Sequence, residues 1–481
     1  MSFIKDSILL IIGFVIKLIF SLLIDRFIAT NILPDLYGMY KYSVTIATLF
    51  SSIAGLGFQS SIVRTISINK NNNSYIKKVI THSLFLILFS IIILFFIINT
   101  AVFYNIFNVS VEVFGIIAFA IIGLTLNQFI VGIFSGLKDV KVKIIVNDIF
   151  QPLLFFVLLF LFSNSINVLF ISKLFVWSIL ISAILNLFFA NKKLVSLYGS
   201  FTFKEINSNI SIRDYYKYTL PILVTTIFIG FALSADKIVL SEIINAEQIG
   251  LYFSAFTLSN ILGFILTSLL FLFLPVASTF YGKGKFLGGS LVSAYISKWL
   301  MLVSFIPFWL LFNYSEDILI WVYSIEYKNA SYVLKILAVA GYINVSVGFT
   351  GQSLLALGDS YSQMIIRFVG VAATLLLAYI LGEMYGINGV AISVLLSLLI
   401  TNSLQVSVAF FKYKVALIQK INIYTYLFIL IVILSLCIGN KVLIIDNFLL
   451  SYTVDIVFYC LMIFVFKIIN IKDYRTVKLI H

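Results

Sequence analysis

The sequence predicts an all-α membrane protein that crosses a bilayer about fourteen times. Hydrophobic residues make up 62% of its 481 residues. Charged residues make up only 11%, less than half of the quarter that is typical of soluble domains. Apolar runs of about 18 residues or more, long enough to span a bilayer, follow one another along nearly the whole chain. This composition excludes a water-soluble fold.

Polar turns separate the apolar runs and set the bounds of the expected helices. The first six are expected near 7–31, 37–66, 79–104, 111–136, 144–163 and 166–190. The next six are expected near 218–243, 249–280, 290–313, 330–357, 360–382 and 386–411. The last two are expected near 422–440 and 448–470. The segment 314–329, which contains Trp321, is either a loop or a short helix at the membrane interface.

Basic residues in the loops predict the orientation of these helices. Cytoplasmic loops of membrane proteins carry an excess of lysine and arginine. Loops after odd-numbered helices hold only Lys328 and Lys441, among many acidic residues, whereas loops after even-numbered helices are rich in lysine. Both termini are therefore expected in the cytoplasm. The net charge of +13 follows from this topology, so nucleic acid is not an expected partner.

The loops and the thiols argue against an enzyme and against a metal site. The longest loop, 191–217, is expected on the cytoplasmic side, whereas a membrane polymerase usually needs a large outer loop that carries its catalytic side chains. The two cysteines, Cys437 and Cys460, lie in separate late apolar runs, and His82 lies far from His481 in the sequence. Such scattered residues predict neither a metal site nor a cofactor.

Two short patterns recur about 211–220 residues apart and predict an internal repeat. In one, an acid–base pair precedes Gly-x-Tyr at the start of a helix; in the other, a turn after a long helix ends in aspartate. The copies are Asp25-Arg26 with Gly38-x-Tyr40, Asp236-Lys237 with Gly250-x-Tyr252, Gly136-Leu137-Lys138-Asp139, and Ala356-Leu357-Gly358-Asp359. Six expected helices separate the copies, and because six is even the two repeats have the same orientation in the membrane.

The repeat predicts the domain organisation. Residues 1–217 are expected to form an N-terminal six-helix lobe with a cytoplasmic linker, and 218–412 a C-terminal six-helix lobe. Residues 413–481 hold two appended helices and a cytoplasmic tail. Two such lobes are expected to enclose a central cavity, the usual position of the substrate site in carriers built from repeats.

Ionisable residues inside the expected helices are candidates for function, because each costs roughly 2.5–3.5 kcal/mol on insertion scales. Cations outnumber acids, which suits an anionic cargo such as a lipid pyrophosphate. Lys17 is expected near the bilayer midplane, and Lys298 and Arg367 roughly 10–12 Å in from the cytoplasmic side. Lysine binds phosphate as a point charge and arginine binds it bidentately. The pairs Asp25-Arg26 and Asp236-Lys237 are expected at the outer ends of their helices. Their cations, Arg26 and Lys237, are either interfacial anchors or parts of an outer gate.

Three acids remain open between two roles. They are Asp25, Asp148 and Asp236. Each either takes up a proton or sodium ion during transport or only neutralises a nearby cation. No other cofactor is expected.

Together these features resemble the polysaccharide and O-antigen flippases of the multidrug/oligosaccharidyl-lipid/polysaccharide exporter superfamily. The resemblance covers nearly the whole chain, although no single motif is diagnostic. The residues that carry it are Asp25-Arg26, Tyr37-Gly38-x-Tyr40, Gly55-Leu56-Gly57 before Arg64, Asp236-Lys237, and Gly250-x-Tyr252. It implies a flippase of the bacterial inner membrane that moves undecaprenyl-pyrophosphate-linked oligosaccharide repeat units, for O-antigen or capsule, to the outer leaflet by alternating access.

The resemblance extends to lipid II flippases, which have basic residues on their first helix, and this implies Lys17, Arg26 and Arg64 as cavity residues. The expected eighth helix has no cation where the lipid II branch carries one, which favours a polysaccharide repeat unit as cargo. The implied partners are lipid-linked oligosaccharide, membrane lipid, and the polysaccharide polymerase and chain-length machinery. The alternatives are a multidrug or toxin cation antiporter of the same superfamily and, less favoured, a membrane polysaccharide polymerase.

Overall fold

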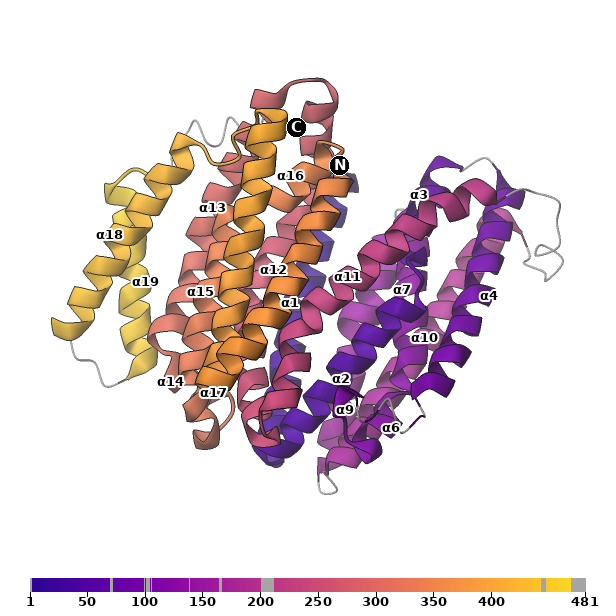
Figure 1. The fold of residues 1–481 in the computed structure, drawn as a ribbon, viewed down its shortest axis with the longest axis horizontal. Coiled ribbons are helices and arrows are strands. Elements are labelled where there is room, and N and C mark those ends of the chain that lie inside the picture. Colours follow the sequence, from indigo (N-terminus) through magenta and orange to yellow (C-terminus); the bar gives the residue numbers. More distant parts are fainter. Residues whose placement is uncertain are drawn as a thin grey trace. The chain divides into compact units, whose positions relative to one another are not determined.

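The computed structural model describes residues 2–69, 72–98, 100, 104, 106–137, 139–163, 167–199, 212–442 and 447–468. Every regular element in these ranges is a helix, and none of them is a strand (Figure 1). Eleven of the described helices are long and apolar enough to cross a bilayer, or twelve if one bent pair counts as a single span. The predicted fold class, an all-α protein with many membrane spans, is confirmed.

The chain divides into two compact units, Met1–Phe253 and Ser254–His481. The helices of the first unit are α1 (Ser2–Asn31), α2 (Pro34–Ala54), α3 (Phe58–Ile68), α4 (Asn73–Ile98), α6 (Val111–Ile117), α7 (Ala120–Gly136), α8 (Val140–Lys143), the π-helix η1 (Ile144–Phe150), α9 (Gln151–Leu161), α10 (Val168–Tyr198), α11 (Arg213–Ile243) and the first turns of α12 (Ala246–Gly282). The second unit holds the rest of α12, α13 (Phe286–Asn313), α14 (Ser315–Val322), the 3-10 helix η4 (Ile325–Ala330), α15 (Ser331–Val347), α16 (Thr350–Ala356), α17 (Ser360–Tyr413), α18 (Lys420–Val442) and α19 (Phe448–Val465).

The units divide the chain at a different place from the predicted lobes. Helix α11, with which the predicted C-terminal lobe begins, packs against α2 and α3 within the first unit. The division into 1–217, 218–412 and 413–481 stays a prediction that rests on the repeat.

Glycines break two of the expected helices. The expected helix 37–66 is bent by 46° between α2 and α3, where Gly57 has a φ of 70°. A Cβ atom on this glycine would lie 2.8 Å from the backbone nitrogen of Leu223 on α11, so only glycine permits the contact. The expected helix 330–357 is broken at Gly348, which has a φ of 76° and separates α15 from α16.

Helix α17 extends over two of the expected helices. Its 54 residues would measure about 80 Å if straight, more than twice the hydrocarbon thickness of a bilayer. Gly386, with a φ of 58° and ψ of −140°, interrupts it. A Cβ atom on Gly389 would lie 1.8 Å from the carbonyl oxygen of Leu381, which shows that the chain folds back on itself here. The two halves correspond to the expected helices 360–382 and 386–411.

The segment 314–329 contains a short helix, α14, of eight residues. At about 1.5 Å per residue it is too short to span a bilayer. Of the two expectations for this segment, the short helix is therefore the one that the structure bears out.

The structure supports the internal repeat through contacts that recur in the two units. The backbone N–H of Asp139 donates to Phe134, and that of Asp359 donates to Leu354, each over 2.9 Å. Each aspartate then pairs with a lysine from the last turns of a later helix. These ion pairs are Asp139 with Lys193 at 3.0 Å and Asp359 with Lys412 at 2.8 Å. A turn and its ion pair are thus built twice from equivalent residues.

The Gly-x-Tyr copies also have a physical explanation, because their glycines bring two helix starts into backbone contact. A Cβ atom on Gly250 of α12 would lie 1.9 Å from the carbonyl oxygen of Pro34 at the start of α2. A Cβ atom on Gly38 would lie 2.5 Å from the carbonyl oxygen of Ala246. Both glycines lie in the first unit, and the helices touch there without intervening side chains.

The turn at Asp359 yields a prediction for stability. Burial would raise the pKa of its carboxyl, but hydrogen bonds from Lys412 and from the side chain and backbone N–H of Ser362 outweigh burial and hold the pKa well below the ordinary 3.8. Because the folded pKa is lowered, the stabilisation is present above about pH 4 and is lost as the pH falls through the lowered value. Asp359→Asn is expected to lower the melting temperature by a few degrees at pH 7.

The pH dependence of that difference provides the check. Thermal unfolding of wild type and Asp359→Asn should converge as the pH is taken from 7 to below 4, and Lys412→Met should behave like Asp359→Asn. A difference that grows on acidification would contradict the assignment.

Candidate functional site

Four aspartates inside the described apolar helices are buried and bonded. They are Asp25, Asp148, Asp236 and Asp455, each at most 3% exposed. A buried carboxylate is costly unless it is paired and hydrogen-bonded. The partners of these aspartates therefore identify the cations whose charge is already neutralised by a carboxylate.

Asp25 on α1 pairs with Lys41 on α2. The Lys41 Nζ atom lies 2.7 and 2.8 Å from the two carboxylate oxygens. The sequence pattern had placed Asp25 beside Arg26, but the Arg26 side chain is exposed. The sequence did hold a signal for Lys41, because 16 residues separate Asp25 from Lys41, as 16 separate Asp236 from Tyr252 in the other copy.

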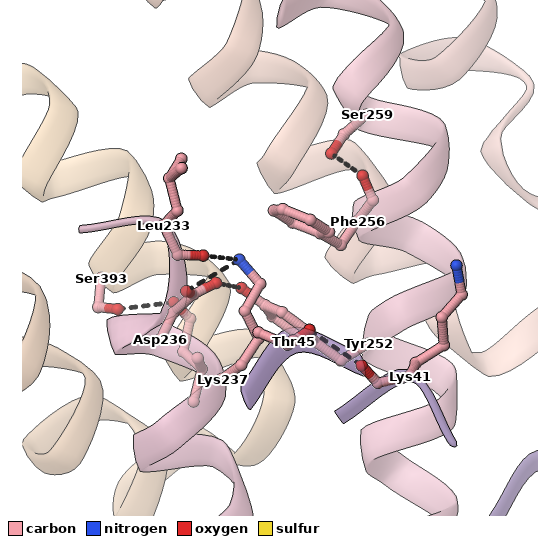
Figure 2. A network of polar contacts seen from close by, with 10 residues as sticks. Lys41, Thr45, Leu233, Asp236, Lys237, Tyr252, Phe256, Ser259 and Ser393 are labelled. Atoms are coloured by element: carbon pink, nitrogen blue, oxygen red, sulfur yellow. Dashed lines mark hydrogen bonds and ion pairs between the residues drawn. The ribbon is translucent and has the colours of Figure 1, made fainter. Parts of the chain in front are cut away.

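Asp236 and Lys237 form a closed cluster with Tyr252 (Figure 2). Lys237 Nζ lies 3.0 Å from Asp236 Oδ1 and donates to the Leu233 carbonyl over 2.9 Å. The Tyr252 hydroxyl, from α12, donates to Asp236 Oδ2 over 2.6 Å. Both charges are about 3% exposed. The acid–base pair of the second copy is thus neutralised within itself.

Asp148 lies in the π-helix η1 and holds two lysines. Lys143 Nζ is 2.7 Å from Asp148 Oδ2, and Lys17 Nζ from α1 is 3.6 Å from Asp148 Oδ1. Pro152 follows one turn later, and because proline cannot donate to the carbonyl four residues before it, the regular helix is disturbed here. Lys17 is 44% exposed and is the more loosely held lysine, so its charge is available to a further anion.

Asparagines form a polar network beside this cluster. Asn186 Nδ2 on α10 donates to Asn127 on α7 and to Asn147 on η1, each over 2.8 Å. In the second unit, Asn402 Nδ2 donates to Asn344 over 3.4 Å. The two amide pairs join equivalent helices of the two repeats, and the sequence patterns did not reveal them.

Arg64 on α3 is exposed, and its guanidinium lies over the Tyr218 ring of α11 at 3.9 Å from the ring centroid. Neighbouring residues at the start of α11 bond to α4: the Tyr215 hydroxyl lies 2.7 Å from Ser83 Oγ, and the Tyr216 hydroxyl 3.2 Å from His82 Nδ1. Arg64 thus presents its charge at a helix junction rich in aromatic residues.

Lys298 on α13 is buried at the end of the appended helix α19. Its ammonium donates to the carbonyl oxygen of Ile468 over 2.6 Å. A cation is favourable where carbonyls of a helix C-terminus point outward. The same two helices are joined by Asp455, which accepts hydrogen bonds of 2.7 Å from Trp309 and Tyr314. The structure therefore gives Lys298 a role in docking α19, beside its predicted role in binding cargo.

Arg367 on α17 is half-buried, and no carboxylate pairs with it among the residues that the structure describes. The predicted roles of all nine candidates stay predictions. These are cargo binding by Lys17, Arg26, Arg64, Lys298 and Arg367, and gating or ion coupling by Asp25, Asp148, Asp236 and Lys237. The structure brings Lys17 to Asp148 and Asp236 to Lys237, but pairs Asp25 with a residue that the sequence had not singled out.

In the described ranges, no three histidine, cysteine or acidic residues gather in a way that would hold a metal ion. Both cysteines are free.

Known proteins were compared with this chain by sequence and by structure. A family model described as "Polysaccharide biosynthesis protein" matches residues 3–280. No curated protein sequence matches the chain.

Solved structures share the fold at low sequence identity. The lipid II flippase MurJ, in an inward closed conformation, is 17% identical with a TM-score of 0.72 and is matched over 95% of this chain and 98% of its own. An inward-facing multidrug resistance MATE transporter is 15% identical with a TM-score of 0.66, over 81% of this chain and 92% of its own. A Pyrococcus furiosus transporter of the MOP superfamily, described as having a binding pocket of reverse polarity, is 15% identical with a TM-score of 0.62, over 84% of this chain and 93% of its own.

Proposed function

Because the chain belongs to the polysaccharide biosynthesis protein family and has the fold of MOP-superfamily transporters, we propose that it is a lipid-linked oligosaccharide flippase. It moves undecaprenyl-pyrophosphate-linked repeat units from the cytoplasmic to the outer leaflet by alternating access. The product would be O-antigen, capsule or a similar surface polysaccharide.

The observation that carries this proposal is the contrast between acids and cations within the apolar helices. The four aspartates Asp25, Asp148, Asp236 and Asp455 are buried and bonded, and the exposed acids Glu242 and Glu383 lie within three residues of a helix end or break, whereas cations remain accessible. The accessible cations are Arg26 and Arg64, which are exposed, and Lys17 and Arg367, which are half-buried. A carrier of cationic drugs needs accessible acids, so this polarity supports an anionic cargo over a multidrug cation antiporter.

The mechanism follows from these charges. The pyrophosphate head enters from the cytoplasmic side and is held by Lys17 and Arg367, and by Lys298 once its ammonium leaves the Ile468 carbonyl, while the prenyl tail stays in the lipid. Lys17 can leave Asp148 for the phosphate because Lys143, at 2.7 Å, keeps that carboxylate neutralised. Arg26 and Lys237 act at the outer gate. Asp25, Asp148 or Asp236 couples the cycle to protons or sodium when its lysine is displaced.

The setting is proposed on the same basis. The protein lies in the bacterial inner membrane with both termini in the cytoplasm, as the loop charges predict. It acts as a transporter without catalysis of its own, and it delivers its cargo to a polysaccharide polymerase and chain-length machinery.

Complementation of a flippase-null strain tests the proposal. Surface polysaccharide should be restored by wild type, and Lys17→Ala and Lys298→Ala should each reduce it at least about tenfold at matched membrane levels, as expected for loss of a charge-assisted contact. Lys173→Ala is the matched control, because Lys173 is an exposed lysine within α10 with no assigned role.

Two outcomes of the complementation experiment would contradict different parts of the proposal. Full activity of both variants would show that the cationic residues do not bind cargo. Failure of wild type together with resistance to cationic drugs in the same cells would favour the antiporter instead.

A further inference from the structure

A polar stripe runs along the first half of α17, residues 360–385. Gln363, Arg367, Gly370 and Thr374 follow one another at intervals of four, three and four residues, the spacing of one helix face. All are buried except Arg367, which is half-buried. The opposite face carries exposed apolar residues: Tyr361, Ile365, Phe368, Leu376, Tyr379 and Ile380. The helix thus presents an apolar face to lipid and a polar face to the protein.

Two glutamines and a threonine meet where α16 begins after the break at Gly348. The Thr350 hydroxyl donates to Gln405 Oε1 over 2.6 Å. A Cβ atom on Gly351 would lie 2.7 Å from Gln363 Nε2 and 3.0 Å from Gln405 Nε2. Both amides therefore lie against the bare backbone of this glycine, and all of these residues belong to the second unit.

This cluster keeps hydrogen-bonding capacity that the described protein does not use. The Gln363 Oε1 atom is buried and accepts no hydrogen bond from the described residues. Arg367 lies one turn beyond Gln363 on the same face, with its guanidinium donors free of any described carboxylate. Gln363 and Thr350 are buried, and Arg367 and Gln405 are half-buried. Leaving such an acceptor unsatisfied is costly, which points to a polar ligand.

We propose that Gln363, Gln405 and Arg367 bind the sugar residue that adjoins the phosphate of a lipid-linked oligosaccharide. The inference rests on the proposed function and adds to it a site for the sugar. An amide both donates and accepts hydrogen bonds, as a sugar hydroxyl does, and a guanidinium binds phosphate oxygens bidentately. The cluster therefore matches a hydroxyl-bearing ring beside an anionic group.

Binding to the purified full-length protein tests this site without any transport step. The two probes are farnesyl pyrophosphate and the same compound carrying one N-acetylhexosamine. Wild type should bind the sugar-bearing probe more tightly. Gln405→Leu and Gln363→Leu should weaken that binding about tenfold and leave farnesyl pyrophosphate within about twofold. Arg367→Gln should weaken both at least tenfold.

Gln128→Leu is the matched control, because Gln128 is a half-buried glutamine of α7 bonded to Ser51, and it should bind both probes as wild type does. Gln405 is half-exposed, so its variant keeps the test valid if Gln363→Leu fails to fold. Equal affinity of wild type for the two probes, or unchanged binding by Gln405→Leu, would overturn the sugar site. Binding of neither probe by wild type would overturn the proposed function and the site with it.

Discussion

Removal of the Asp236 carboxylate, with Lys237 left in place, is expected to destabilise the protein by about 3–5 kcal/mol. Both side chains are about 3% exposed; the Tyr252 hydroxyl donates to Asp236, and Lys237 donates to the Leu233 carbonyl. Without the carboxylate, a buried ammonium would retain only a backbone carbonyl among the partners shown in Figure 2. The melting temperature in mild detergent should therefore fall by roughly 3–5 °C in Asp236→Ala.

A double variant tests whether the loss of stability comes from leaving Lys237 charged without its carboxylate. Asp236→Leu combined with Lys237→Met removes both charges, and replacing a buried ion pair by apolar residues is often nearly neutral for stability. The double variant should recover most of the lost melting temperature. Glu242→Ala, an exposed acid on the same helix, serves as control and should melt like wild type. If Asp236→Ala also melts like wild type, the two charges are not the closed pair that the structure shows.

The second large effect is expected at Gly250. A Cβ atom there would lie 1.9 Å from the carbonyl oxygen of Pro34, far inside contact distance, and the obstacle is backbone that cannot rotate away. Gly250→Ala should force α2 and α12 apart and destabilise the protein by about 3 kcal/mol or more, the upper range for overpacking. Gly38→Ala should act in the same direction, since its Cβ would meet the Ala246 carbonyl at 2.5 Å.

Gly263 provides the control on the same helix. A Cβ atom added there meets nothing within 4 Å, so Gly263→Ala should gain about 0.5–1 kcal/mol through helix propensity. Thermal unfolding of the three variants, read by size-exclusion chromatography after heating, gives the comparison. Equal stability of Gly250→Ala and Gly263→Ala would contradict the backbone contact.

The helices and the repeat could be predicted from the sequence because both depend on short local patterns of residues. Apolar runs give the spans, and the turns at Asp139 and Asp359 recur with the same neighbours. The breaks were harder to predict. Glycines are common in membrane helices, and only the approach of α11 distinguishes Gly57 as a break from a glycine that merely allows packing.

The partners of the candidate residues could not be predicted, because they depend on which helix faces which. Asp25 had a cation next to it in the sequence, but successive residues on a helix point in different directions, and Lys41 from α2 is the one that reaches it. Lys298 met the end of a helix 170 residues away. The cluster of Gln363 and Gln405 was not predicted because a neutral amide inside a membrane helix does not stand out by charge. The contact of both amides with Gly351 depends on the packing of separate helices, which the sequence alone does not give.

The doubled turns bear on how such a protein arises and is made. Equivalent turns at Asp139 and Asp359, each closed by a lysine from a later helix, are most simply inherited from one ancestral gene of six helices copied in tandem. If each copy holds the six spans predicted from the sequence, the second copy enters the bilayer in the same orientation as the first, and its basic loops stay on the predicted cytoplasmic side. A single duplication could therefore yield an insertable chain at once, with no stage at which one half was synthesised upside down.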